Sequence, residues 1–127
     1  MRKKFDEELR HLNNLLLEMA MINEGAIKKA ISLLDEKDEK IAEEVSNYEE
    51  RTDVYEGIIQ KQCLKIFVEQ QPAAGDLRRV SSALKMITDM ERIGDNTRDI
   101  AEICMMLPHD YDTSRFPLIK EMADSTI

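Results

Sequence analysis

Residues 5–34 read FDEELRHLNNLLLEMAMINEGAIKKAISLL, and their apolar side chains recur at alternating steps of four and three residues. The repeat holds from Phe5 to Leu34, except that Asn23 interrupts the stripe. Residues at this spacing share one face of an α-helix, so the stretch predicts a long amphipathic helix that buries this face against other helices. The chain is therefore expected to be all-α.

A second helix is expected from about Asp38 to Gln70, because the Asp38 side chain can accept hydrogen bonds from the free amides at a helix start. Pro72 prevents its continuation, since proline lacks an amide proton and clashes with the preceding turn. The buried seam of this helix is expected to contain Ile41, Val45, Tyr48, Thr52, Tyr55, Ile59, Gln62 and Ile66.

A third helix is expected to begin with Asp76 as its N-cap and to run to Leu107, where Pro108 ends it. Its apolar residues cover a wider face, which predicts a central position. Phe116-Pro117-Leu118 resembles the start of a fourth helix. The predicted architecture is an antiparallel three-helix bundle followed by the start of a fourth helix.

The composition limits the possible partners and compartments. With 127 residues the chain is expected to form one domain, and 26 acidic against 18 basic residues give a formal charge of -8, which argues against binding nucleic acid. Cys63 and Cys104 lie in apolar helical contexts without C-x-x-C spacing, as expected for reduced core thiols. No apolar stretch is long enough for a signal peptide or a membrane span, so a soluble, cytoplasmic protein is expected.

Two carboxylate pairs with helical spacing are the candidate functional residues: Glu49-x-x-x-Asp53 on the second helix and Glu91-x-x-x-Asp95 on the third. Both pairs border the predicted buried faces. If they faced each other at about 5 Å, each cross-pair repulsion would be on the order of 3 kcal/mol at an effective dielectric of about 20. A bound cation would turn this repulsion into attraction, because Mg²⁺, Mn²⁺, Ca²⁺, iron and zinc all accept carboxylate ligands. The alternative is that these acids belong to solvated helix faces.

The residues around the second pair carry a resemblance. Glu91-Arg92-Ile93-Gly94-Asp95 follows the turn Gln71-Pro72-Ala73-Ala74-Gly75-Asp76-Leu77-Arg78, and Glu49-Glu50-Arg51-Thr52-Asp53 lies midway along the second helix. Over its whole length the chain resembles the PhoU family of phosphate-signalling regulators. The resemblance implies a PhoU-like, spectrin-repeat-like bundle at residues 1–107, with a linker and the beginning of a second repeat at 108–127. Glu121-Met122-Ala123, which repeats Glu18-Met19-Ala20, then reads as the opening of that repeat.

The resemblance also implies a function. Carried onto this sequence, the metal ligands are Glu49, Asp53, Glu91 and Asp95, with Asp99 one turn further on. They would hold an iron or zinc cluster, or Mn or Mg. The implied role is negative regulation of phosphate uptake and of the phosphate-starvation response, through contact with the ATPase of the phosphate ABC transporter and with a sensor histidine kinase. A homo-oligomer such as a dimer is implied, with peripheral membrane association only and no catalysis.

Two alternatives compete with this interpretation. A di-iron enzyme needs Glu-x-x-His on two helices, and Glu8-Leu9-Arg10-His11 is the only such spacing in the sequence. The stronger alternative is an acidic helical module that docks a partner protein without metal. In that case six methionines could form an adaptable surface, although methionines at helical spacing are also ordinary core residues: Met19, Met21, Met86, Met90, Met105 and Met106.

One glycine has its own hypothesis. Gly94 lies inside the third helix, where glycine costs about 1 kcal/mol relative to alanine. Its position on the core side between Glu91 and Asp95 predicts that another helix approaches closely there and brings the second helix within ligand distance. Close packing without a metal role is the alternative explanation.

Overall fold

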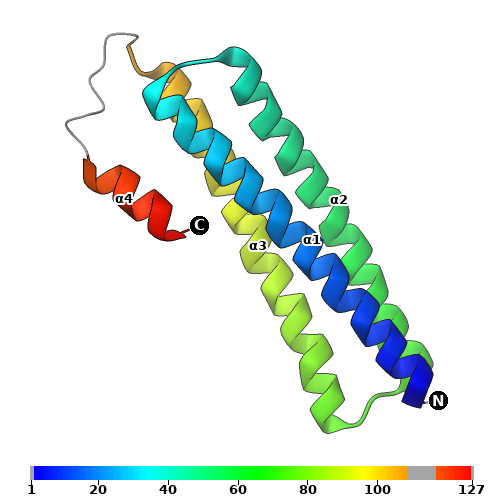
Figure 1. The fold of residues 1–127 in the computed structure, drawn as a ribbon. Coiled ribbons are helices and arrows are strands. Elements are labelled where there is room, and N and C mark those ends of the chain that lie inside the picture. Colours follow the sequence, from blue (N-terminus) through cyan, green and yellow to red (C-terminus); the bar gives the residue numbers. More distant parts are fainter. Residues whose placement is uncertain (1, 109–116, 127) are drawn as a thin grey trace.

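The computed structural model of this chain describes residues 2–108 and 117–126. These residues form four helices: α1 (Arg2–Asp35), α2 (Glu39–Gln70), α3 (Ala74–Met106) and α4 (Pro117–Thr126). The first three lie side by side, with α2 antiparallel to α1 and α3 (Figure 1). At 1.5 Å per residue, each long helix extends about 50 Å. The predicted all-α bundle with the start of a fourth helix is confirmed.

The ends of α2 agree with the prediction. Oδ1 of Asp38 accepts a hydrogen bond from the backbone amide of Lys40 at 2.9 Å, which caps the N-terminus of the helix. At the other end, Gln71 has a left-handed backbone (φ 40°, ψ 61°), and Pro72 follows. The chain therefore turns sharply after Gln70 and cannot continue the helix.

The prediction that Asp76 caps α3 is wrong. The helix begins at Ala74, and its N-cap position is occupied by Ala73, whose methyl group cannot accept a hydrogen bond. Asp76 lies in the first turn, where a carboxylate is favourable because of the helix dipole. Its Oδ2 accepts a hydrogen bond from the Arg2 guanidinium at 2.6 Å, so this carboxylate ties the start of α3 to the start of α1.

Two apolar clusters form the core. The larger lies near the N-terminus of α1 and contains Phe5, Leu12, Leu15, Leu16, Met19, Ile59, Cys63, Ile66, Val80, Ala83 and Ile87. The smaller lies near the C-terminus of α1 and contains Ala30, Leu33, Val45, Ala101 and Cys104. Between them along the helices lie the buried polar residues Asn23 and Thr52 together with Gly94. The bundle thus has a polar layer at its middle, and the acidic pairs lie at the same level.

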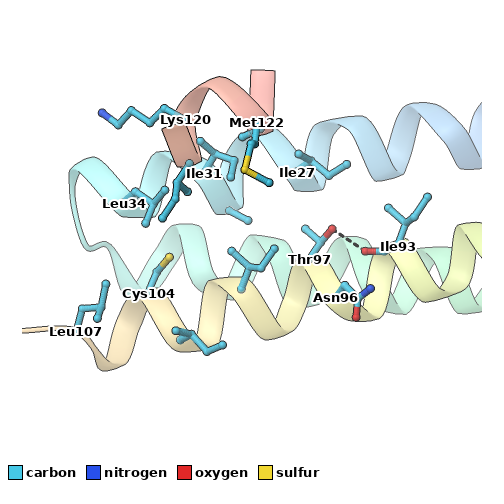
Figure 2. A pocket seen from close by; sticks show the side chains of 15 residues that line it. Ile27, Ile31, Leu34, Ile93, Asn96, Thr97, Cys104, Leu107, Lys120 and Met122 are labelled. Atoms are coloured by element: carbon cyan, nitrogen blue, oxygen red, sulfur yellow. Dashed lines mark hydrogen bonds between the residues drawn. The ribbon is translucent and has the colours of Figure 1, made fainter. Parts of the chain in front are cut away.

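The short helix α4 lies beside the end of the bundle where α1 and α3 both terminate (Figure 1). Between α1, α3 and α4 is a groove of about 570 Å³, lined mainly by aliphatic side chains such as Ile27, Ile31 and Ile93 (Figure 2). Lys120 of α4 forms an ion pair with Asp35 of α1. Phe116, named in the sequence analysis, lies outside the described residues. Among the residues described, none of the helices combines the length and the apolar character needed to cross a membrane.

Candidate metal centre

The acidic side chains that α2 directs toward α3 are spaced by four and three residues. Glu49, Asp53 and Glu56 therefore form a stripe along one face of α2. On α3, Glu91 and Asp95 are four residues apart and border the buried face that contains Gly94. Because α2 and α3 are antiparallel neighbours, these two stripes meet along the helix interface.

Two overlapping groups of carboxylates result in the part of the chain that the structure describes. One contains Glu49, Asp53 and Asp95, and the other contains Asp53, Glu56 and Glu91. Within each group, one carboxylate oxygen per residue lies within 4.8 Å of those of the other two. At that separation two full negative charges repel by about 1 kcal/mol in bulk water and by about 3 kcal/mol near a protein surface. Asp53 belongs to both groups and joins them.

Burial and the neighbouring carboxyls together raise the pKa of three of these residues. For Glu91 the main cause is a hydrogen bond shared with Glu56, and burial and the charge of Glu56 add to it, so its pKa is about 7. Burial is the main cause for Glu49, followed by a hydrogen bond with Asp95. Burial also raises the pKa of Asp53, with the charges of Glu91 and Asp95 adding to it. Without a cation, Glu91 therefore keeps its proton to a higher pH than an isolated carboxyl does.

A cation of the chain itself lies at the edge of this cluster. Nη1 of Arg98 on α3 is 3.1 Å from Oε1 of Glu49 on α2. The same guanidinium is 3.9 Å from Asp99 and 4.0 Å from Glu102. Its positive charge lowers the pKa of Glu49 and of Asp53, opposing the crowding. One positive charge among five clustered carboxyls leaves the site acidic.

The structure brings together four of the five residues expected as ligands, namely Glu49, Asp53, Glu91 and Asp95. Asp99 belongs to neither group: its side chain is 57% exposed and faces Arg98. Glu56 was not among the expected ligands, although it follows Asp53 by three residues on the same helix face. Its spacing was visible in the sequence, but its meeting with Glu91 depends on how α2 and α3 are aligned along their length.

Gly94 lies on the face of α3 that contacts both α1 and α2. A Cβ built on Gly94 would be 3.5 Å from Cγ2 of Thr52 on α2 and 3.4 Å from Oδ1 of Asn23 on α1. The predicted close approach at Gly94 is confirmed, and it involves both neighbouring helices. Because α2 is this close to α3 at Gly94, the carboxylates of Asp53 and Asp95, one residue further along each helix, can share a site.

The two cysteines and His11, also named in the sequence analysis, lie outside both carboxylate groups. Cys63 and Cys104 are free and buried in the core, as expected for reduced thiols, and burial raises the pKa of Cys63 to about 11. A thiol that is protonated at neutral pH is a weak nucleophile. His11 is exposed on α1.

The donor set fits a hard cation. Both groups offer carboxylate oxygens, which Mg²⁺, Mn²⁺ and Ca²⁺ prefer and which iron and zinc accept. A cation bound at Asp53 would lie between the two groups, and a pair of cations would share this residue. In either arrangement the cation replaces the protons that the crowded carboxyls hold without it.

Comparison with known proteins assigns the chain to a family. A family model for the PhoU domain matches residues 16–104. Three relatives are each named a phosphate-specific transport system accessory protein PhoU homolog. The relative from Aquifex aeolicus is 30% identical, over 98% of this chain and 59% of its own length. The relative from Pseudomonas putida is 33% identical over 89% of this chain and 44% of its own length, and that from a Burkholderia species is 33% identical over 98% and 55%. The chain spans about half the length of the curated relatives it matches. Together with the helical bundle, the matches show that this chain belongs to the PhoU domain family.

Proposed function

We propose that this chain is a metal-dependent regulator of phosphate uptake, which holds one or two cations between α2 and α3 and acts by contact with other proteins. The observation that carries the proposal is the pair of overlapping carboxylate groups joined by Asp53. Acidic residues of a solvated surface can separate to reduce their repulsion, whereas these side chains converge from two helices until their oxygens lie within 4.8 Å of one another. Convergence of this kind is stabilised when a cation enters.

The ligands in this proposal are Glu49, Asp53 and Asp95 for one position, and Asp53, Glu56 and Glu91 for the other. A bound cation neutralises the α2–α3 interface and holds the two helices together there. Iron, zinc, Mn²⁺ and Mg²⁺ are all compatible with these oxygen ligands. Asp99, which lies beyond Arg98, becomes a ligand only if its side chain rotates toward Asp95.

The partners follow from the family. The relatives carry the name of accessory proteins of the phosphate-specific transport system, which supports association with a phosphate transporter. We extend this to contact with the transporter ATPase and with a sensor histidine kinase, restraining phosphate uptake and starvation signalling from the cytoplasm. The protein would act as a homo-oligomer with peripheral membrane association only. The proposal includes no catalytic step.

Thermal unfolding with and without metal tests the proposal. The melting temperature of the chain is expected to rise on addition of Mn²⁺, Zn²⁺ or Fe²⁺ and to fall on chelation, because the cation binds only the folded carboxylate cluster. Asp53→Asn is expected to raise the melting temperature of the metal-free protein, since it removes the repulsion shared by both groups, and to abolish the increase with metal. Asp89→Asn, an exposed aspartate on α3 outside both groups, is the matched control and should retain that increase.

A second candidate function is a protein-interaction module that works without metal. Two observations favour it: Arg98 already supplies a cation to Glu49, and the aliphatic groove beneath α4 offers an apolar surface. Met21, Met86 and Met106 are also exposed, as an adaptable binding surface requires. This candidate predicts that binding to the transporter ATPase is the same in Mn²⁺ and in chelator. Loss of binding in chelator, restored by Mn²⁺, supports the metal-dependent function.

A further inference from the structure

Helix α1 supplies none of the carboxylates in the two groups. One of its polar side chains, that of Asn23, nevertheless lies at the level of the metal centre. Asn23 of α1 is only 5% exposed, and it interrupts the otherwise apolar stripe of this helix. Its Nδ2 donates a hydrogen bond to the backbone carbonyl of Met90 on α3 at 2.9 Å. Its Oδ1 accepts a hydrogen bond from the hydroxyl of Thr52 on α2 at 3.3 Å. One amide side chain thus connects all three helices.

Gly94 lies directly beside this connection. The Met90 carbonyl pairs within an α-helix with the amide four residues later, which is that of Gly94. A side chain at this position would project toward Asn23, since a Cβ there would lie 3.4 Å from its Oδ1. A Cβ alone would be in ordinary van der Waals contact with Asn23, whereas a longer side chain at this position would press on it.

The two residues that Asn23 hydrogen-bonds on the other helices, and Gly94 beside them, are each directly followed by a carboxylate of the metal centre. Thr52 precedes Asp53, Met90 precedes Glu91, and Gly94 precedes Asp95. We infer that Asn23 is a positioning residue of the metal centre, which fixes the separation and alignment of α2 and α3 and thereby the distance between Asp53, Glu91 and Asp95. This inference rests on the proposed metal-binding function.

The role can be separated from a contribution to folding. The hydroxyl of Thr52 also lies 3.0 Å from the carbonyl of Tyr48 in its own helix, and the Met90 carbonyl has its helical partner. When Asn23 is replaced by leucine, which also branches at Cγ but is larger, both groups keep a hydrogen-bond partner within their helices. No buried group is then left without a partner, so the loss of stability is limited to the cost of fitting the larger side chain. The alignment of Asp53, Glu91 and Asp95, in contrast, depends on the two hydrogen bonds of Asn23 that this variant loses.

The test is the affinity for Mn²⁺, measured by calorimetry on the metal-free full chain, together with its melting temperature. Asn23→Leu is expected to weaken Mn²⁺ binding roughly 10- to 100-fold, the usual effect of removing a group that orients metal ligands, and by more than the change in the metal-free melting temperature explains. Thr52→Val should also weaken binding, whereas Thr52→Ser, which keeps the hydroxyl, should restore most of the affinity.

Thr97→Val is the matched control. Thr97 is also a buried threonine, and its hydroxyl donates to the carbonyl of Ile93 in its own helix at 2.7 Å. This variant should bind Mn²⁺ as the unsubstituted chain does. Unchanged affinity in Asn23→Leu and in Thr52→Val would overturn the positioning role while leaving the metal centre intact. Absence of Mn²⁺ binding by the unsubstituted chain would instead overturn the proposed metal function and the positioning role with it.

Discussion

Arg98 on α3 places a guanidinium nitrogen 3.1 Å from Oε1 of Glu49 on α2, so the carboxylate cluster contains a positive charge of its own. The Glu49 side chain is only 13% exposed, whereas that of Arg98 is 37% exposed. The arginine therefore covers one end of the cluster while the opposite end, at Glu56 and Glu91, has no comparable ion pair among the described residues. A cation from solution, if it binds as proposed, would compete with Arg98 for the charge of the same acids.

Removing the positive charge of Arg98 should strengthen the binding of a metal cation. Arg98→Met keeps the aliphatic stem but removes the charge, so the metal-free chain is expected to lose up to about 1 kcal/mol of stability, a small effect because the guanidinium is partly solvated. The affinity for Mn²⁺ should rise a few-fold, since the competing positive charge is gone. Calorimetric titration checks this, with Arg92→Met, an exposed arginine on the same helix, as control. Weaker Mn²⁺ binding in Arg98→Met would contradict the competition.

The raised pKa of Glu91 predicts a dependence of stability on pH. Its usual value of 4.5 applies in the unfolded chain, and its value of about 7 in the folded chain means that the folded chain binds the proton more tightly. The stabilisation is complete below about pH 4.5 and is lost as the pH rises through about 7. Glu49 and Asp53, with raised pKa values, act in the same direction.

In Glu91→Gln the side chain is uncharged at every pH, as the protonated form of Glu91 is. Relative to the unsubstituted metal-free chain, its melting temperature should gain more at about pH 8 than at about pH 5, because only at the higher pH does the unsubstituted chain carry the repelling charge. Thermal melts over this range measure the difference. Glu43→Gln, an exposed glutamate of α2 outside the cluster, serves as control. A constant difference between Glu91→Gln and the unsubstituted chain across the range would show that Glu91 holds no proton near neutral pH.

Substitution of Gly94 tests whether stability at this position is limited by close packing of the helices or only by the low helix propensity of glycine. Gly94→Leu must place its side chain against Asn23 and Thr52, and overpacking of this kind costs about 1–3 kcal/mol. A Cβ on Gly57 of α2 meets nothing within 4 Å, so Gly57→Leu should be neutral or slightly stabilising. Denaturant unfolding measures both. Mn²⁺ affinity should fall further in Gly94→Leu than its loss of stability alone explains. Equal stability of Gly94→Leu and Gly57→Leu would argue against tight packing at Gly94.

Phosphate itself should not bind to the metal-free chain. The carboxylate cluster and the formal charge of -8 repel a multivalent anion, so any response to phosphate must pass through bound metal or through the transporter. Calorimetric titration of phosphate into chelator-treated protein should give no binding heat, with sulfate as the comparison. Tight phosphate binding after complete chelation would contradict this expectation.

The helices could be predicted from sequence because their signals are local. The stripe from Phe5 to Leu34, the Asp38 cap and the position of Pro72 each depend on residues within a turn or two of one another. Asp76 failed as a cap because its carboxylate lies one turn inside α3 and pairs with Arg2, a residue 74 positions earlier. A long-range ion pair of this kind leaves no mark in the local pattern.

The sequence predicts four of the five carboxyls of the two groups, whereas their arrangement depends on how α2 and α3 pack. At 100° per residue, Asp99 lies about 80° around α3 from Glu91, whereas Arg98 lies within about 20° of it, so Arg98 and not Asp99 faces α2. Glu56 shares the stripe of Asp53, but its meeting with Glu91 depends on the axial alignment of two helices. Asn23 looked like an interruption of the apolar stripe, and only the packed bundle relates it to Thr52 and Met90.

The most direct measurement is a crystal structure of the chain soaked in Mn²⁺, with anomalous diffraction collected to locate the ion. The account predicts an anomalous peak coordinated by Asp53 together with Asp95 or Glu91, and its loss in crystals of Asp53→Asn. A structure in which Mn²⁺ binds elsewhere while the carboxylates of α2 and α3 remain unligated would contradict it.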